Sequence, residues 1–166
     1  MGCYLGNMTE APLLTSWNDY AAAAEELLAG ACHSVAIFDQ DLMALRLERP
    51  AAIASITRLL HTSPAHSLRI VVRNASPLRH QHPQLMALLR TFAHNFHVVE
   101  TPPHLAHLAD AMLLADDTSA LIRFHQDHAR SKKVIGDAEA CKPYQRRFDE
   151  LWSEGGTQVS ATTVGL

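Results

Sequence analysis

Short apolar runs alternate with longer amphipathic segments along the first two thirds of the chain. Residues 34–38, 68–73 and 96–99 are apolar runs with β-branched residues, which is typical of strands that are buried on both faces of a sheet. Around these runs, apolar residues recur at spacings of three and four, which predicts helices. Because helices between strands act as crossovers, this order predicts parallel pairing of the early strands.

Capping residues predict where the helices begin and end. Ser16 is placed to cap the first helix and Gly30 to end it, while Pro50 begins a second helix, where a missing N–H costs little. Pro83 divides a later helical segment into a turn and a longer helix. Pro143 is expected to begin the last helix, whose apolar positions include an aromatic residue near its end.

The segment of residues 104–128 has the pattern of a hairpin. Residues 112–115 are apolar, Asp116 and Asp117 supply turn chemistry, and residues 120–122 are apolar again. Histidines and further acids crowd around this segment, so a functional site is most plausible here. Turn residues between two such runs predict two antiparallel strands added to the early parallel ones.

These elements predict one α/β domain, with a central mixed, mostly parallel sheet flanked by helices. We expect the domain to span residues 15–156, preceded by a flexible segment at residues 1–14. Residues 157–166 are light and polar, so they are expected to lie on the surface as a tail. No internal repeat or low-complexity linker divides the chain.

Composition narrows the class of protein. The chain has 166 residues, 48% of them hydrophobic, which argues against disorder, and its net charge of −3 makes nucleic-acid binding unlikely. The three cysteines form no C-x-x-C pair, and no segment resembles a signal peptide, so a cytoplasmic location is expected. No apolar run approaches the length that spans a membrane.

Two features suggest where a ligand would bind. Residues 123–147 hold seven basic and three acidic residues, which indicates either a solvated basic face or an anion site. Asp39 and Arg73 follow the first two buried strands, and side chains at such strand ends often contact ligands in α/β folds. A loop or a helix cap is the competing explanation for the acidic residue.

The element order, the run M-L-L-A-D-D at residues 112–117 and a closing helix that carries Phe148, Leu151 and Trp152 resemble one half of the phospholipase D superfamily. That superfamily carries the motif H-x-K-x-x-x-x-D. Placing its aspartate on Asp116 puts the histidine on Ala109 and the lysine on Ala111. Because alanine can neither attack a phosphodiester nor stabilise its charge, the resemblance implies the fold and argues against the activity.

The second part of the superfamily motif, G-S-x-N, is also changed. Its glycine and serine fall on Arg123 and Phe124, and its asparagine falls on Gln126. The whole chain also resembles a family of uncharacterised bacterial proteins that share the run P-x-H-L-x-H-L-A-D and the ending T-T-x-G-L.

The resemblance implies a catalytically inactive domain that binds a ligand or assembles with a partner, with no cofactor. Because the superfamily builds its site from two halves and this chain holds one, a homodimer is expected. An anionic ligand would be held by basic and imidazole side chains, namely Arg73, Arg123, His125, His128 and Lys132. The competing explanation is that these side chains only neutralise nearby aspartates.

Two other functional classes stay open. His104, His107 and Asp110 follow one another at spacings of three, which is compatible with a metal site and would make the protein a metal-dependent hydrolase with rebuilt chemistry. With eleven histidines in the chain, such spacings also arise by chance. The remaining class is a purely structural module.

Overall fold

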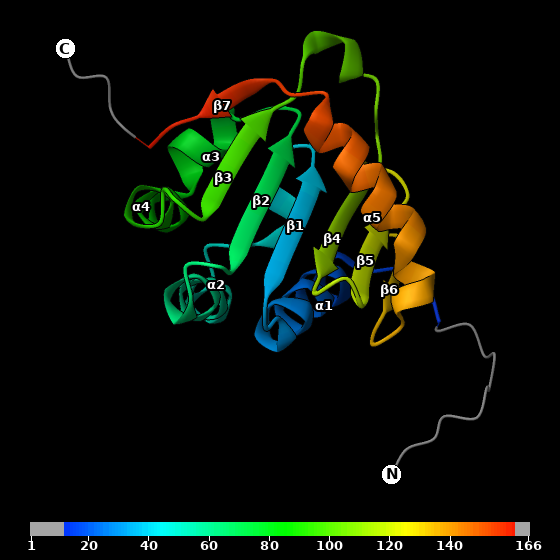
Figure 1. Cartoon of the computed structure of the whole chain (residues 1–166). Coiled ribbons are helices and arrows are strands. Elements are labelled where there is room, and N and C mark those ends of the chain that lie inside the picture. Colours follow the sequence, from blue (N-terminus) through cyan, green and yellow to red (C-terminus); the bar gives the residue numbers. More distant parts are fainter. Residues whose placement is uncertain (1–11, 162–166) are drawn as a thin grey trace.

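The apolar runs form the central strands of one mixed sheet in the computed structural model, which describes residues 12–161 (Figure 1). The strands are β1 (Ser34–Asp39), β2 (Ser67–Val72), β3 (Phe96–Glu100), β4 (Ala111–Ala115), β5 (Ser119–Arg123), β6 (Ser131–Val134) and β7 (Thr157–Val159). The helices are α1 (Trp17–Gly30), α2 (Pro50–Thr62), α3 (Ser76–Gln81), α4 (Pro83–Thr91) and α5 (Ala138–Ser153), with 3₁₀ turns η1 (Met43–Leu45) and η2 (Pro103–Leu105).

The strand order is β6-β5-β4-β1-β2-β3-β7. Strands β1, β2 and β3 are parallel, as the intervening helices predicted, and the pairings β1–β4, β4–β5, β5–β6 and β3–β7 are antiparallel. The sheet is therefore mixed, as expected. Parallel pairs do not predominate: the hairpin already gives as many antiparallel as parallel pairings, and two edge strands that the apolar pattern did not indicate add two more antiparallel ones.

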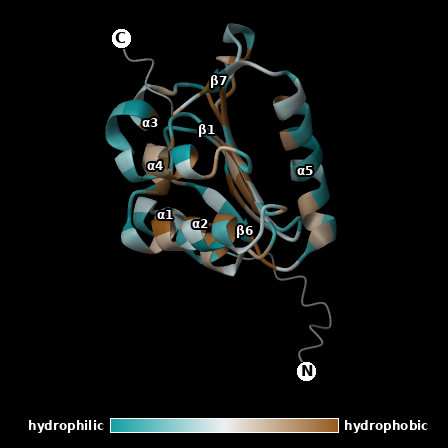
Figure 2. Ribbon diagram, turned by 60° about the vertical axis from the view of Figure 1, so that its left-hand side comes forward, coloured by the Kyte–Doolittle hydropathy of each residue, from teal (hydrophilic) through white to brown (hydrophobic). Residues whose placement is uncertain are grey.

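Helices cover the two faces of the sheet unequally. Helices α1 to α4 lie on one face and α5 lies alone on the other (Figure 2). The residues of each strand alternate between the two sides, so that Ile37 belongs to the apolar cluster under α1 and α2, whereas Phe38 belongs to the cluster under α5. No helix within residues 12–161 is long and apolar enough to cross a membrane.

Several predicted helix ends are confirmed. The hydroxyl of Ser16 accepts a hydrogen bond from the N–H of Asp19 at 3.0 Å, and α1 ends at Gly30. Pro50 is the first residue of α2, and Pro83 separates α3 from α4. A serine cap therefore marks the start of α1, and prolines at the first helical position mark the starts of α2 and α4.

The predicted start of the last helix is wrong. Helix α5 begins at Ala138, capped by Asp137, whose carboxylate accepts a hydrogen bond from the N–H of Ala140 at 3.0 Å. Pro143 lies inside the helix and is exposed. The aspartate cap and Glu139 in the first turn favour an earlier start, although Pro143 in the second turn removes one backbone hydrogen bond of the helix.

The expected terminal segments are also corrected. Residues 157–159 do not lie free on the surface but pair with β3 as β7, and Val159 is buried in the core. At the other end, Leu14 exchanges two backbone hydrogen bonds with Ser131 of β6. Residues 1–11 of the expected flexible segment lie outside the described residues.

The turn of the predicted hairpin is held against the start of β1. Asp116 and Asp117 both have positive φ values, 56° and 60°, which aspartate tolerates better than most residues. The carboxylate of Asp116 accepts hydrogen bonds from three backbone N–H groups, those of Cys32, His33 and Ser34, at 2.7, 2.7 and 3.0 Å. Asp116 therefore fixes where the hairpin meets the central strand.

We predict that Asp116→Ala lowers the free energy of unfolding by about 2–3 kcal/mol, because charge-assisted hydrogen bonds are lost together with a residue suited to positive φ. Asp117→Asn is the matched control, since Asp117 shares the turn geometry but is exposed. Urea denaturation measures both variants. Equal effects of the two changes would contradict the anchoring role.

The pH dependence of Asp116→Asn provides a second readout of the same contact. Partial burial opposes ionisation, but the N–H donors of Cys32, Ser34 and His33 hold the pKa of Asp116 below its usual range. A depressed pKa in the folded state adds stability above the unfolded value of about 3.9. The stability advantage of the wild type over this variant should therefore shrink as the pH falls below that value.

Candidate functional site

The candidate site lies at the end of the sheet opposite the Asp116 turn, where β1 and β5 end and β4 begins. Ala111 begins β4, and the hairpin register places it directly opposite Arg123 of β5. Phe38 pairs with Met112, so Asp39 follows on the other side of Ala111. Ala111 on β4 thus lies between Asp39 on β1 and Arg123 on β5.

Asp39 and Arg123 form a buried ion pair over Ala111. Nη2 of Arg123 donates to Oδ1 of Asp39 at 2.9 Å, and the two side chains are only 0% and 2% exposed. Oδ2 of Asp39 also accepts the N–H of Leu42 at 2.7 Å. Burial raises the pKa of Asp39, and the charge of Arg123 and the N–H donors oppose that rise.

Two aromatic rings of α1 complete the surroundings of this guanidinium. The ring centroids of Trp17 and Tyr20 lie 5.3 and 5.0 Å from the central guanidinium carbon of Arg123. Cation–π contacts of this kind stabilise a cation that has left water. Burial raises the pKa of the Tyr20 hydroxyl, so that side chain stays neutral. Arg123 is therefore a core residue whose charge is paired inside the protein, while its Nε and Nη1 have no hydrogen-bond partner in the described part of the chain.

Arg73 connects β2 to the loop after β5. Its guanidinium lies 5.0 Å from the ring centroid of Phe38 and donates to the carbonyl of Asp110 at 2.9 Å and to Oε1 of Gln126 at 3.2 Å. Burial lowers the pKa of Arg73, and the carboxylates of Asp39 and Asp110 oppose that fall. Both terminal nitrogens of Arg73 thus position the chain, whereas its buried Nε has no hydrogen-bond partner within the described residues.

The histidine and lysine positions of the phospholipase D motif are both occupied by alanine. Ala109 is half-buried and Ala111 is buried, and Asp116 is bonded to backbone N–H groups at the far end of the hairpin. Arg123 occupies the position of the motif glycine and fills the space beside Ala111. This arrangement can hold charge, but its cation is already neutralised by Asp39.

The alternative metal site is not assembled. Asp110 accepts two hydrogen bonds from Arg147, at 3.0 and 2.7 Å. His104 lies 3.3 Å from a carboxylate oxygen of Glu154, and Nδ1 of His107 lies 3.0 Å from the carbonyl of His104. Within residues 12–161, no group of three histidine, cysteine or acidic side chains is placed to hold a metal ion.

The predicted anion-binding residues are divided among three places. His125 and His128 lie together, with ring centroids 5.6 Å apart, and line a hollow of about 510 Å³ with Thr15, Phe124, Ala129 and Arg130. Lys132 lies elsewhere, its ammonium 5.9 Å from the ring of Tyr144 on α5. The guanidinium groups of Arg73 and Arg123 bond to other residues of the protein. Among the predicted residues, the two histidines therefore face an open hollow.

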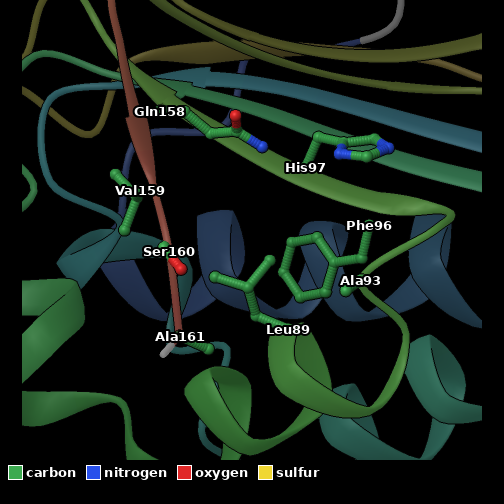
Figure 3. A pocket seen from close by; sticks show the side chains of 8 residues that line it. All are labelled: Leu89, Ala93, Phe96, His97, Gln158, Val159, Ser160 and Ala161. Carbon is green, nitrogen blue, oxygen red and sulfur yellow. The ribbon is translucent and has the colours of Figure 1, made fainter. Parts of the chain in front are cut away.

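A second hollow lies at the other edge of the sheet, between α4 and β7 (Figure 3). It measures about 240 Å³, and His97 is the one ionisable side chain among the residues that line it. Leu89, Ala93 and Phe96 form its apolar side. This lining offers little chemistry for recognising a charged ligand.

A sequence profile matches residues 16–161 of the chain. The chain belongs to the family DUF7931, a domain of unknown function. A search of curated proteins finds no significant match. The family assignment therefore covers nearly all of the described structure but brings no activity with it.

Solved structures show that the DUF7931 domain has the phospholipase D fold. Nuc from Salmonella typhimurium, a phospholipase D family member, is 10% identical with a TM-score of 0.56, and the match covers 84% of this chain and 90% of that one. NucT from Helicobacter pylori is 12% identical with a TM-score of 0.57, covering 88% and 97%. The fold implied by the sequence resemblance is thus confirmed.

A third similar structure is TrmBL2, an archaeal chromatin protein described as showing a novel mode of DNA binding. It is 14% identical with a TM-score of 0.64, and the match covers 91% of this chain. The DUF7931 domain spans only 56% of the TrmBL2 chain. At this identity the likeness concerns the fold alone.

Sequence reasoning identified Asp39 and Arg123 separately but missed that they pair. Their numbers lie far apart, and only the antiparallel placement of β4 between β1 and β5 brings them together. The signal in the sequence that could have indicated the pair is the small residue Ala111 in β4, the strand between β1 and β5. Arg130, which lines the hollow beside the histidines, was noted only as part of a basic stretch.

We predict that Arg123→Met lowers the free energy of unfolding by about 3–5 kcal/mol, because it leaves the buried carboxylate of Asp39 without a partner. Adding Asp39→Asn should restore part of this loss, since the amide oxygen can still accept the N–H of Leu42. Guanidinium denaturation of the single and double variants gives the coupling. Additive effects would show that the pair is not coupled.

Proposed function

We propose that this DUF7931 domain is a catalytically inactive phospholipase D-like domain that acts as a binding and assembly module. The observation that carries this proposal is the buried pair of Asp39 and Arg123. It closes the end of the sheet where the resemblance places the catalytic lysine, at Ala111. A site filled by its own neutralised cation offers no vacancy in which a phosphodiester and a nucleophile can meet.

The ligand we propose is a small anion, bound beside the loop of residues 124–130. His125 and His128 face a hollow there, and Arg130 lies on the same rim. Arg130 has no carboxylate within 4 Å among the residues that the structure describes, so its charge is not neutralised by an acid; its guanidinium lies over the ring of Phe124. Guanidinium and imidazole groups suit phosphate or carboxylate groups.

DNA binding, which the description of TrmBL2 reports for that protein, is the less favoured alternative. The net charge of −3 opposes the approach of a long polyanion. Many exposed cations already have partners, as in the pairs Lys133–Glu26 and Lys142–Glu139. A small anion needs only one local cluster of donors.

We further propose that the domain works as a homodimer in the cytoplasm. Support for the dimer comes from the resemblance, in which two such halves meet about a twofold axis, and from the prevalence of twofold dimers. The axis would pass near the ends of β4 and β5, where the loop of residues 124–130 also lies.

Purified protein is expected to show no turnover of bis(p-nitrophenyl) phosphate above the buffer background, with or without added zinc or manganese. Its motif positions lack a nucleophile at Ala109 and a charge stabiliser at Ala111. Release of nitrophenol by the wild type would contradict inactivity. If His107→Ala then abolished that release, the metal-dependent hydrolase would be favoured instead.

Size-exclusion chromatography with light scattering should give a mass of twice the 18.3 kDa chain. The mass should fall toward that of one chain on dilution if the association is reversible. A single-chain mass at high protein concentration would eliminate the dimer without affecting the prediction of inactivity.

A further inference from the structure

We infer that the hollow beside the loop of residues 124–130 binds a nucleoside phosphate, with the base on Phe124 and the phosphate at Arg130 and His128. This inference rests on the proposed anion binding and specifies the class of anion. It comes from an unusual neighbourhood, in which an exposed aromatic ring, an unpaired arginine and two histidines share one rim of the fold.

Phe124 offers a stacking surface. Its side chain is 46% exposed although the ring is large and apolar, and it lines the hollow together with Ala129. The guanidinium of Arg130 lies over this ring, 6.0 Å from its centroid, so a base that stacks on Phe124 would share the ring with that guanidinium. A planar base stacks favourably on such a ring, whereas inorganic phosphate has no aromatic group that could stack on it. The apolar part of the lining therefore favours an anion that carries a flat aromatic group.

The phosphate-binding side is formed by Arg130 and the histidine pair. Arg130 is exposed and without a carboxylate partner within residues 12–161, whereas Nδ1 of His125 accepts a hydrogen bond from the N–H of Asp127 at 3.1 Å. One ring nitrogen of His125 is therefore already bonded within the loop. This leaves Arg130 and the ring of His128 as the principal donors to a phosphate group.

The loop is held in place before any ligand binds. The N–H of Phe124 donates to the carbonyl of Arg130 at 3.3 Å, and the N–H of His128 donates to that of His125 at 3.1 Å. From the sheet, Arg73 donates to Gln126 at 3.2 Å. A tethered loop loses little freedom on binding, which favours recognition of a small ligand.

The size of the hollow agrees with a mononucleotide. Its volume of about 510 Å³ lies within the range of roughly 300–1,000 Å³ that is usual for small-ligand pockets. The Asp127 carboxylate on the same loop disfavours a chain of many phosphates. One base and one phosphate group match one ring and one unpaired arginine.

Calorimetric titration of the 166-residue chain with adenosine monophosphate, adenosine and inorganic phosphate tests the inference. The monophosphate should bind more tightly than either of the other two. Arg130→Gln should weaken its binding by about tenfold, the loss expected for one charge-assisted hydrogen bond. Arg90→Gln is the matched control, because Arg90 is an exposed arginine on α4 and should leave binding unchanged.

The Phe124→Leu variant distinguishes the contribution of the base to binding from that of the phosphate group. It should weaken binding of the monophosphate and leave that of inorganic phosphate unchanged, and circular dichroism checks that the exposed substitution leaves the fold intact. Equal binding of phosphate and the monophosphate, unaffected by Phe124→Leu, would overturn this inference while anion binding stands. Absence of binding by both would overturn the inference and the proposed anion binding together.

Discussion

The structure depends on the satisfaction of one buried charge. Asp39 ends the central strand with no exposed surface, so its carboxylate needs a cation and N–H donors within the protein. Arg123 supplies the cation from two strands away, and Trp17 and Tyr20 of α1 enclose it. The first helix, the central strand and the hairpin are thereby joined at one point, although they lie far apart in the sequence.

The hairpin is fixed at both ends by carboxylates that act differently. Asp116 holds the turn by accepting backbone N–H groups, whereas Asp39 holds the strand end through a guanidinium. This difference explains why the motif aspartate can be present while the motif histidine and lysine are absent. Its bonds to the start of β1 serve the fold, and they are needed whether or not the domain catalyses a reaction.

Local sequence signals were sufficient for the central strands, the hairpin and most helix ends, because each depends on apolar runs or caps that neighbouring residues supply. Strand β6 was missed because its residues are mostly polar and only half-buried, and β7 because its three residues gain their order from β3. The site was harder to predict. The pairing of Arg123 with Asp39 depends on strand order, which no local pattern encodes.

Strand order also links two changes that look independent in the motif. The resemblance places a lysine at residue 111 and a glycine at residue 123, and this chain has Ala111 and Arg123, which lie directly opposite each other in the sheet. The positive charge that the motif has on β4 is therefore found on the neighbouring strand, β5, in this chain. Ala111 leaves room for the longer side chain, and Asp39 neutralises it where it lies. Where the motif has a cation that faces substrate, this chain has a cation in the core, and for this reason the proposed recognition site is the loop that follows β5 rather than the sheet end itself.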